Sequence, residues 1–267
     1  MNDQALLASG SYNVYMGSAL SSIAALSKGI PVITVATVFQ KSPICIYTHK
    51  NISTMDQLKH SKRTTILEAK KDMDNWWPCA VQKFGFAKSR MGTYTGSLIP
   101  FLEGNKIAQQ GYIINEGYDI KKADVKFNTF LLANYGYPQY SEPIESTKSF
   151  ADKHSNILRK FILASMIGWK SCMSNPELGD KLILKVNKKQ ALAHLKFAVR
   201  MIKKYNLLTD KSLGYRLDEM SNKRWNSIYD VALAGKIVEK GFNVKRAYSL
   251  AFMKNIDVKL VIPKDYE

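Results

Sequence analysis

The sequence predicts an α/β fold, in which strands and helices alternate over the first half and long helices dominate the second. Residues 31–39 form a continuous β-branched run, which is typical of a strand buried on both faces. Short apolar segments before and after it alternate with helical segments that end at glycines. Residues 53–135 repeat this alternation, which indicates a sheet with parallel connections.

The individual elements of the first half follow from apolar runs and from capping residues. Ser18 is a candidate N-cap for a helix over 19–27 that stops at Gly29, and its first N–H groups suit an anion or a carbonyl. A second capping pattern at 53–56 predicts a short helix through Leu58. Helices are also expected at 76–85 and 98–104, and strands at 12–16, 31–39, 44–47, 64–67, up to 97, 111–114, 127–133 and from 143 to 147.

Three long helices are predicted after residue 150. They span 156–172, 188–205 with Asn187 as N-cap, and 222–234 with Ser221 as N-cap. Their apolar residues recur at helical spacing, so we expect them to be core positions. In the first two helices these are Leu158, Phe161, Ile162, Ser165, Gly168, Trp169 and Cys172, then Ala191, Leu195, Ala198, Met201, Ile202 and Tyr205.

The stretch 108–118 is the first candidate for a binding site. Its apolar strand ends in Glu116, a carboxylate between Tyr112 and Tyr118, and Gly117 is expected to allow a sharp turn. Ligands of open α/β sheets lie outside the carboxyl ends of strands. Glu116 would suit a planar, amine-bearing ligand that stacks on a tyrosine, and the alternative is a solvated acid beside two packing tyrosines.

The tryptophan pair Trp76-Trp77, at the start of a predicted helix, leaves two interpretations open. One ring walls an aromatic pocket, or one ring packs in the core while the other lies on the surface.

The net charge of +17 suggests nucleic acid first, but the lysines are spread over almost every segment and no nucleic-acid motif is visible. Attraction of an anionic solute is the other interpretation. The three cysteines and four histidines show no metal spacing, and a catalytic Cys–His pair is the remaining alternative. No apolar run is long enough to span a bilayer, and no signal peptide is visible.

Taken together, these motifs resemble the solute-binding proteins of NitT/TauT-type ABC importers, which include binders of sulfonates, nitrate and the pyrimidine precursor of thiamine. The resemblance covers essentially the whole chain. It rests on Leu7-Ala8-Ser9-Gly10, Tyr15-Met16-Gly17-Ser18, Gly29-Ile30-Pro31-Val32, Phe39-Gln40-Lys41-Ser42-Pro43, Trp77-Pro78, Phe84-Gly85-Phe86, Gln109-Gln110-Gly111-Tyr112, Tyr135-Gly136-Tyr137 with Tyr140, Ile167-Gly168-Trp169, Asn175-Pro176, Met220 with Arg224-Trp225, and Lys245-Arg246-Ala247-Tyr248.

The resemblance implies a two-lobed periplasmic-binding-protein fold of the second type, with the ligand in a cleft between lobes. Residues 1–50 and 136–267 would form lobe 1, and residues 51–135 lobe 2. The implied ligand-binding positions are Gly17, Ser18, Gln40, Lys41, Asn75, Trp76, Trp77, Tyr94, Thr95, Tyr112, Asn115, Glu116 and Tyr118.

Two departures from the family are visible in the sequence. Relatives have a small residue and proline near Glu116, where this chain has Asn115 and Gly117. Relatives also begin with a signal peptide, a strand, a helix and a second strand, none of which is present here. We therefore expect an N-terminally truncated chain that lacks the central strand of lobe 1 and is poorly stable by itself.

The expected function is solute binding for an ABC importer, outside the cytoplasm, without catalysis, cofactor or metal. The expected partners are a small planar nitrogen-containing solute such as a thiamine pyrimidine precursor and a membrane permease, with the protein a monomer and no nucleic acid. An oxyanion such as sulfonate or nitrate ranks second, because Glu116 would repel it. A thiamine-pyrimidine-synthase-like enzyme is the further alternative, although the cysteine-rich motif of that branch is absent.

Overall fold

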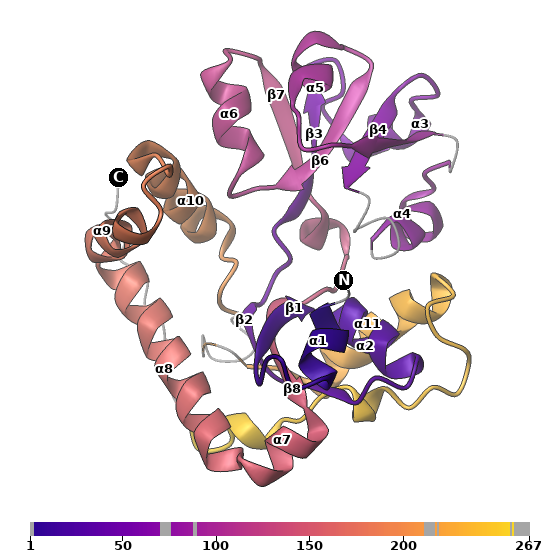
Figure 1. Cartoon of the computed structure of the whole chain (residues 1–267). Coiled ribbons are helices and arrows are strands. Elements are labelled where there is room, and N and C mark those ends of the chain that lie inside the picture. Colours follow the sequence, from indigo (N-terminus) through magenta and orange to yellow (C-terminus); the bar gives the residue numbers. More distant parts are fainter. Residues whose placement is uncertain are drawn as a thin grey trace. The chain divides into compact units, whose positions relative to one another are not determined.

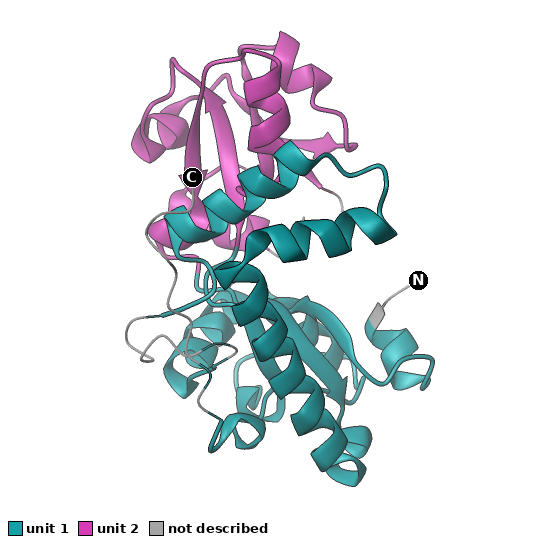
Figure 2. Ribbon diagram, turned by 90° about the vertical axis from the view of Figure 1, so that its left-hand side faces the viewer, with its two compact units in different colours: residues 1–42, 138–267 teal, residues 43–137 magenta. Residues whose placement is uncertain are grey.

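The computed structural model describes residues 3–69, 76–87, 90–210, 217, 219–256 and 258. Contacts divide the chain into two compact units, coloured separately in Figure 2. Unit 1 comprises Met1–Ser42 with Pro138–Glu267, and unit 2 comprises Pro43–Tyr137.

Unit 1 contains a three-stranded sheet in the order β1-β8-β2. These strands are β1 (Tyr15–Ser18), β8 (Ser141–Thr147) and β2 (Val32–Phe39), and β8 pairs antiparallel with both neighbours. Every residue of β2 is buried, as its continuous β-branched run predicts. An isolated parallel bridge joins Thr34 of β2 to Tyr248 near the C-terminus.

Helices make up most of the rest of unit 1 (Figure 1). Three short helices precede or follow its strands in the sequence: α1 (Asp3–Ala8), α2 (Ala19–Ser27) and α7 (Lys148–Lys153). The long helices are α8 (Ser155–Ser174), α9 (Pro176–Val186), α10 (Leu192–Tyr205) and α11 (Asn222–Ala234), followed by the 3-10 turns η5 (Val244–Arg246) and η6 (Ala251–Met253).

Unit 2 contains a five-stranded mixed sheet in the order β5-β4-β6-β3-β7. Its strands are β3 (Ile44–His49), β4 (Thr65–Ala69), β5 (Met91–Tyr94), β6 (Ile107–Tyr112) and β7 (Phe127–Leu131). Its helices are α3 (Met55–His60), α4 (Trp77–Phe84), α5 (Ile99–Glu103) and α6 (Glu116–Lys122), with the 3-10 turn η3 (Leu132–Tyr135). The predicted parallel connections hold for β4 with β5 and β6, whereas β3 runs antiparallel to β6 and β7.

The strand β3 lies in unit 2, although the sequence assigned all of residues 1–50 to the first lobe. The reason is its pairing: Cys45 is opposite Gly111 on β6 and Leu131 on β7, so β3 is an inner strand of that sheet. Strand membership depends on partners far away in the chain, which the apolar pattern of a strand does not reveal.

Two helix predictions need correction. The helix α9 was not predicted, and the predicted helix over 188–205 begins only at Leu192. Asn187 follows α9, its N–H donates to Ile183 O at 2.7 Å, and its side-chain oxygen accepts from Lys189 N at 3.2 Å. Asn187 therefore ends one helix and opens a turn instead of capping the next helix.

The predicted apolar stripe of α8 is also too wide. Its buried residues are Leu158, Ile162, Met166 and Met173, whereas Phe161 is 43% exposed. Each residue turns a helix by about 100°, so Phe161 lies well around the helix from its neighbour Ile162. Among the described residues, no helix has the length and apolar composition needed to cross a bilayer.

Candidate functional site

In unit 1, the end of β1 and the start of α2 form the first group of predicted site residues. Ser18 caps α2, as predicted, because its side-chain oxygen accepts from Ser21 N at 3.2 Å. The same hydroxyl lies 2.8 Å from Ser21 Oγ. The cap serves one of the first backbone N–H groups of α2, and the N–H groups before it have no acceptor within the helix.

Gln139 lies over this helix end, although its position in the sequence gave no indication of this. With its amide oxygen toward α2, the orientation that satisfies both ends of the amide, Gln139 accepts from Ala19 N, Leu20 N and Ser18 Oγ, each at 3.2 Å. The side chain is only 3% exposed. Two backbone N–H groups and the Ser18 hydroxyl, whose proton Ser21 Oγ also accepts, thus surround one oxygen, and a helix N-terminus offers such an arrangement to an anion.

Gly17 has no room for a side chain. A Cβ there would lie 2.7 Å from Tyr15 Cε1 and 2.8 Å from Glu145 Oε1. Glu145 is fully buried on β8, and burial raises the pKa of its carboxyl to about 8, opposed in part by hydrogen bonds to Ser22 and Gln4. Gly17 therefore serves the close packing of β1 on β8 beside the α2 N-terminus.

Gln40 and Lys41 hold other segments of unit 1. Gln40 is fully buried, and its Nε2 donates to Glu219 O at 2.5 Å. Lys41 Nζ donates to Tyr205 O at 3.2 Å, at the last residue of α10, where a cation complements the helix dipole. Gln40 and Lys41 were both predicted to contact the ligand, and in the structure both side chains instead bond to backbone carbonyls of other segments.

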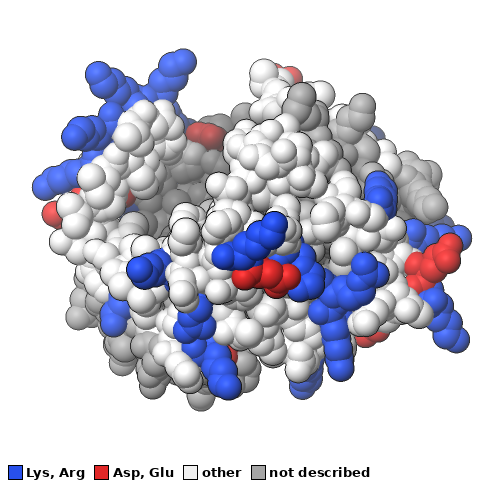
Figure 3. Space-filling model, turned by 60° about the horizontal axis from the view of Figure 1, so that its bottom comes forward, with Lys and Arg blue, Asp and Glu red and all other residues white. Residues whose placement is uncertain are grey.

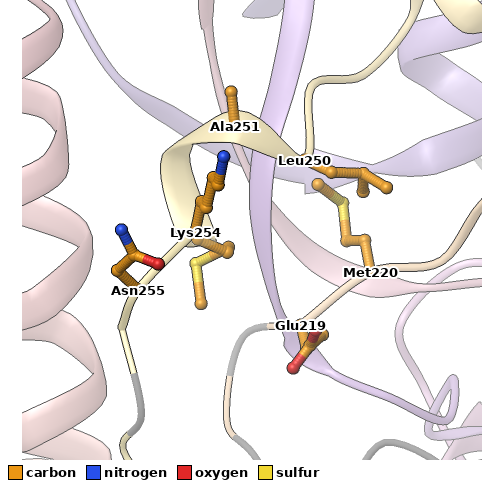
Figure 4. Close-up of a pocket in the computed structure, with 7 residues that line it drawn as sticks. Glu219, Met220, Leu250, Ala251, Lys254 and Asn255 are labelled. Atoms are coloured by element: carbon orange, nitrogen blue, oxygen red, sulfur yellow. The ribbon is translucent and has the colours of Figure 1, made fainter.

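A hollow of about 510 Å³ lies in unit 1 beside the segment that Gln40 holds. Its lining comes from two segments, which Figure 4 shows: Glu219 and Met220 before α11, and Leu250, Ala251, Met253, Lys254 and Asn255 around η6. None of the predicted site residues lines this hollow.

In unit 2, three parallel strands end at the same edge of the sheet. Tyr94 ends β5, Ala69 ends β4 and Tyr112 ends β6. Tyr94 is half-buried and Thr95 after it is exposed. The pKa of Tyr94 is raised by burial first, then by the charges of Glu116 and Asp119. The strand ends therefore gather a phenol and a carboxylate at the edge of the sheet where ligands of open α/β sheets lie.

The carboxylate of Glu116 is hydrogen-bonded to the backbone of Tyr112, four residues before it. It is 7% exposed, it begins α6, and its Oε2 accepts from Tyr112 N at 2.7 Å. Burial raises the pKa of this carboxyl, and the backbone hydrogen bond from Tyr112 lowers it to a smaller extent. The carboxylate thus closes the loop between β6 and α6, which makes it a poorer contact for a solute than its sequence position suggests.

Two neighbours make this arrangement possible. The Tyr47 hydroxyl donates to Tyr112 O at 3.1 Å and accepts from Gly117 N at 3.1 Å. A Cβ on Gly111 would lie 2.6 Å from Glu116 Oε2, so only glycine admits the carboxylate. The sharp turn expected at Gly117 was wrong, because Gly117 lies inside α6 and the chain turns where Asn115 N donates to Tyr112 O at 2.8 Å.

The other predicted residues of unit 2 differ in exposure. Asn115 is exposed and makes no side-chain cap to α6, and Tyr118 is half-buried. Trp76 is fully buried and Trp77 is 4% exposed, with an edge-on contact of 5.5 Å between their rings. Both indoles pack in the core of unit 2, so neither one lies on the surface. Asn75 lies outside the described residues.

Sequence reasoning missed Gln139, Tyr47 and Gln110, whose Oε1 accepts from Ala69 N at 2.7 Å. All three side chains carry polar atoms in apolar surroundings, and such atoms are normally buried only with a hydrogen-bond partner. A polar side chain within a predicted buried strand was visible in the sequence for Gln110, but its hydrogen-bond partner, Ala69 N, was not. Among the described residues, no group of three or more His, Cys, Asp or Glu side chains is placed to hold a metal ion.

Two α/β units, each with its own sheet, are the parts from which the periplasmic-binding-protein fold is built, and solved structures of that fold are similar to this chain. The aliphatic sulphonate binding protein SsuA from Escherichia coli is similar, with a TM-score of 0.65 and 14% identity over 98% of this chain and 83% of that one. The alkanesulfonate-binding protein SsuA from Xanthomonas axonopodis pv. citri, bound to MOPS, is also similar. Its TM-score is 0.64 at 12% identity, over 92% of this chain and 83% of that one.

A third similar structure is the Candida albicans CA3427 gene product, described as having the generic periplasmic binding protein fold. Its TM-score is 0.60 at 12% identity, over 98% of this chain and 85% of that one. These likenesses confirm the predicted fold class. The model of the family described as NMT1/THI5 like matches residues 2–178, and the chain belongs to this family. No curated protein matches the sequence.

Proposed function

We propose that this chain is the solute-binding component of an ABC importer and that its solute is a small anion of the sulfonate type. The observation that carries the solute class is the cradle at α2, in which Ser18 Oγ, Ala19 N and Leu20 N converge on one oxygen at 3.2 Å. A sulfonate oxygen is an acceptor of the same kind with a full charge, which a helix N-terminus favours.

The engaged carboxylate of Glu116 supports this solute class. The sequence ranked an amine-bearing solute first because a free acid would repel an oxyanion. Burial raises the pKa of the Glu116 carboxyl and so disfavours its charged form, which the hydrogen bond from Tyr112 N opposes only in part. Because Oε2 already accepts from Tyr112 N, this oxygen is also less available to a solute. The net charge of +17 also attracts an anion.

Two of the similar structures are named as binders of sulfonates, which agrees with the same solute class. In the proposal, units 1 and 2 are the two lobes, and the importer's permease recognises the solute-bound state. Binding acts through a difference in affinity between two conformations, with no chemical step. The location would then be extracytoplasmic, as for periplasmic relatives, and the protein would act as a monomer.

The candidate solute contacts in the proposal are the residues that the structure leaves accessible. These are Gly17 and Ser18 in unit 1, and Tyr94, Thr95, Tyr112, Asn115 and Tyr118 in unit 2. Gln139 takes the place of an acceptor oxygen at α2, so the solute's oxygen either replaces the Gln139 amide or lies beside it.

A thermal-shift screen against MOPS, a short alkanesulfonate, nitrate and an aminopyrimidine tests the proposal. A solute at a hundred times its dissociation constant stabilises by about 2.7 kcal/mol, which gives a clear shift. Gln139→Glu places a fixed carboxylate in the α2 cradle and should abolish the sulfonate shift by charge repulsion. The matched control is Gln57→Glu, because Gln57 Oε1 accepts from Ser53 N at 2.7 Å and a glutamate there keeps that role.

A sulfonate shift that survives in Gln139→Glu would remove the α2 cradle from the site. The second candidate solute is a planar nitrogen-bearing compound such as a thiamine pyrimidine precursor, because Tyr94 and Glu116 lie near one another in unit 2. A response to the aminopyrimidine alone, lost in Glu116→Ala, would favour this candidate over the sulfonate.

A further inference from the structure

The helix α9 exposes an apolar stripe beside lysines. Leu178 is 48% exposed, Leu182 59% and Val186 85%, and their spacing of four residues places them along one side of the helix. Lys181 and Lys185 each lie one position before a leucine or valine of this stripe, so they border it. We call these five residues the α9 face.

The opposite side of α9 is packed, so the α9 face is the side that points away from the rest of unit 1. Gly179 approaches α8 so closely that a Cβ there would lie 2.5 Å from Cys172 Sγ. Asp180 is 4% exposed. With α9 held on this side, its leucines and lysines are presented outward on a fixed scaffold.

Apolar exposure and positive charge are both concentrated here. Nine of the fourteen large hydrophobic side chains recorded as exposed in the described residues lie on α8, α9 and α10. Residues 176–205 carry eight Lys and Arg against two acidic residues. Figure 3 shows Lys and Arg side chains outnumbering Asp and Glu on the face that it presents.

We propose that the α9 face docks on the surface of a bilayer that contains anionic lipids. A helix with an apolar stripe flanked by lysines inserts the stripe into the headgroup boundary while the lysines contact anionic headgroups. A second copy of this chain does not fit, because it would bring the same lysines and a net charge of +17 against each other. Nucleic acid would pair with the lysines but would leave the leucines exposed.

The stripe spans nine residues from Leu178 to Val186, or roughly 12 Å of helix, which permits shallow contact only. Docking of this kind is reversible and weak. It would keep the protein close to the membrane whatever solute it carries, so it does not depend on the solute class.

Vesicle flotation tests this docking, with full-length protein, phosphatidylcholine vesicles, and vesicles with 30% phosphatidylglycerol. Wild type should float with the anionic vesicles and not with the neutral ones, and binding should fall at high salt. Lys181→Gln with Lys185→Gln should weaken binding by about fivefold for each lysine removed. Leu178→Ser with Leu182→Ser should weaken binding by at least about tenfold.

Controls are available at positions of equal exposure. Ile99→Ser in unit 2 removes a side chain that is 59% exposed, the same as Leu182, and should leave flotation unchanged. Lys121→Gln with Lys122→Gln, on α6, controls for net charge. Thermal melts with and without sulfonate show that each variant is folded, and they separate failure of docking from failure of the proposed solute binding.

Several results would overturn the proposal. Wild type that floats with neither vesicle, or with both equally, contradicts it. Equal losses in the α6 and α9 lysine variants would reduce the effect to general charge. Dimers in light scattering that dissociate in Leu178→Ser with Leu182→Ser would make a second copy the occupant of the α9 face.

Discussion

The contact between Gly111 and Glu116 gives the sharpest test of the loop that closes the unit 2 strand edge. In Gly111→Ala, the new Cβ would lie 2.6 Å from Glu116 Oε2, 2.9 Å from its carboxyl carbon and 2.9 Å from Tyr47 Cε2. Overpacking of this kind costs about 1–3 kcal/mol. Glu116→Ala removes the acceptor of Tyr112 N, a charge-assisted hydrogen bond worth about 1.5–3 kcal/mol.

The two substitutions should not be additive. In the Glu116→Ala background, two of the three close contacts of the new Cβ are gone, so the cost of Gly111→Ala should fall by about 1 kcal/mol or more. Urea unfolding of wild type, both single variants and the double variant, followed by circular dichroism and tryptophan fluorescence, measures this coupling.

A matched control is Gly168→Ala on α8, where a Cβ would meet no atom within 4 Å. That change should stabilise the protein by about 0.5–1 kcal/mol, because alanine favours a helix more than glycine does. If Gly111→Ala costs the same with and without the Glu116 carboxylate, the carboxylate does not occupy the position described, and its hydrogen bond to Tyr112 is refuted.

The remaining predictions concern unit 1. Burial raises the pKa of Glu145 from 4.5 to about 8, so the folded chain retains a proton that the unfolded chain loses over this pH range. The contribution of protonated Glu145 to the free energy of unfolding should therefore be fully present below about pH 4.5. It should be lost as the pH rises to about 8, by at most about 5 kcal/mol. Thermal melts of Glu145→Gln across this range should show a flatter dependence of stability on pH. Equal slopes for the two proteins would contradict the assignment. Ser221→Ala removes the acceptor of Arg224 N, 3.2 Å away at the start of α11, and should cost about 1 kcal/mol in urea unfolding. An unchanged midpoint would show that this cap contributes nothing.

Local signals in the sequence located several elements well. Ser18 and Ser221 cap α2 and α11, whose ranges match the predicted 19–27 and 222–234, because an N-cap and its helix lie within a few residues of each other. The buried strand β2 was recognisable from its β-branched run for a similar reason. These features depend on residues that are close in the sequence, because the interactions that stabilise them join residues only a few positions apart.

The site depended on contacts between distant residues. Nothing near Gln139 in the sequence indicates that its amide oxygen would cover Ala19 N and Leu20 N, more than a hundred residues earlier. Likewise, the free carboxylate expected at Glu116 became a bonded one because β6 placed Tyr112 N and Gly111 beside it, and Tyr47 on β3 completed the network.

The sequence by itself therefore determined the class of fold, the caps Ser18 and Ser221, the buried strand β2, and the order of the motifs that indicated the family of this chain. Only the tertiary structure decided which strands share a sheet, which polar side chains are bonded to the backbone, and which helix face stays exposed. A hydrogen bond or a packed surface stabilises a fold only through its partner, and in this protein the partners of Gln139, Tyr47 and α9 lie in other elements.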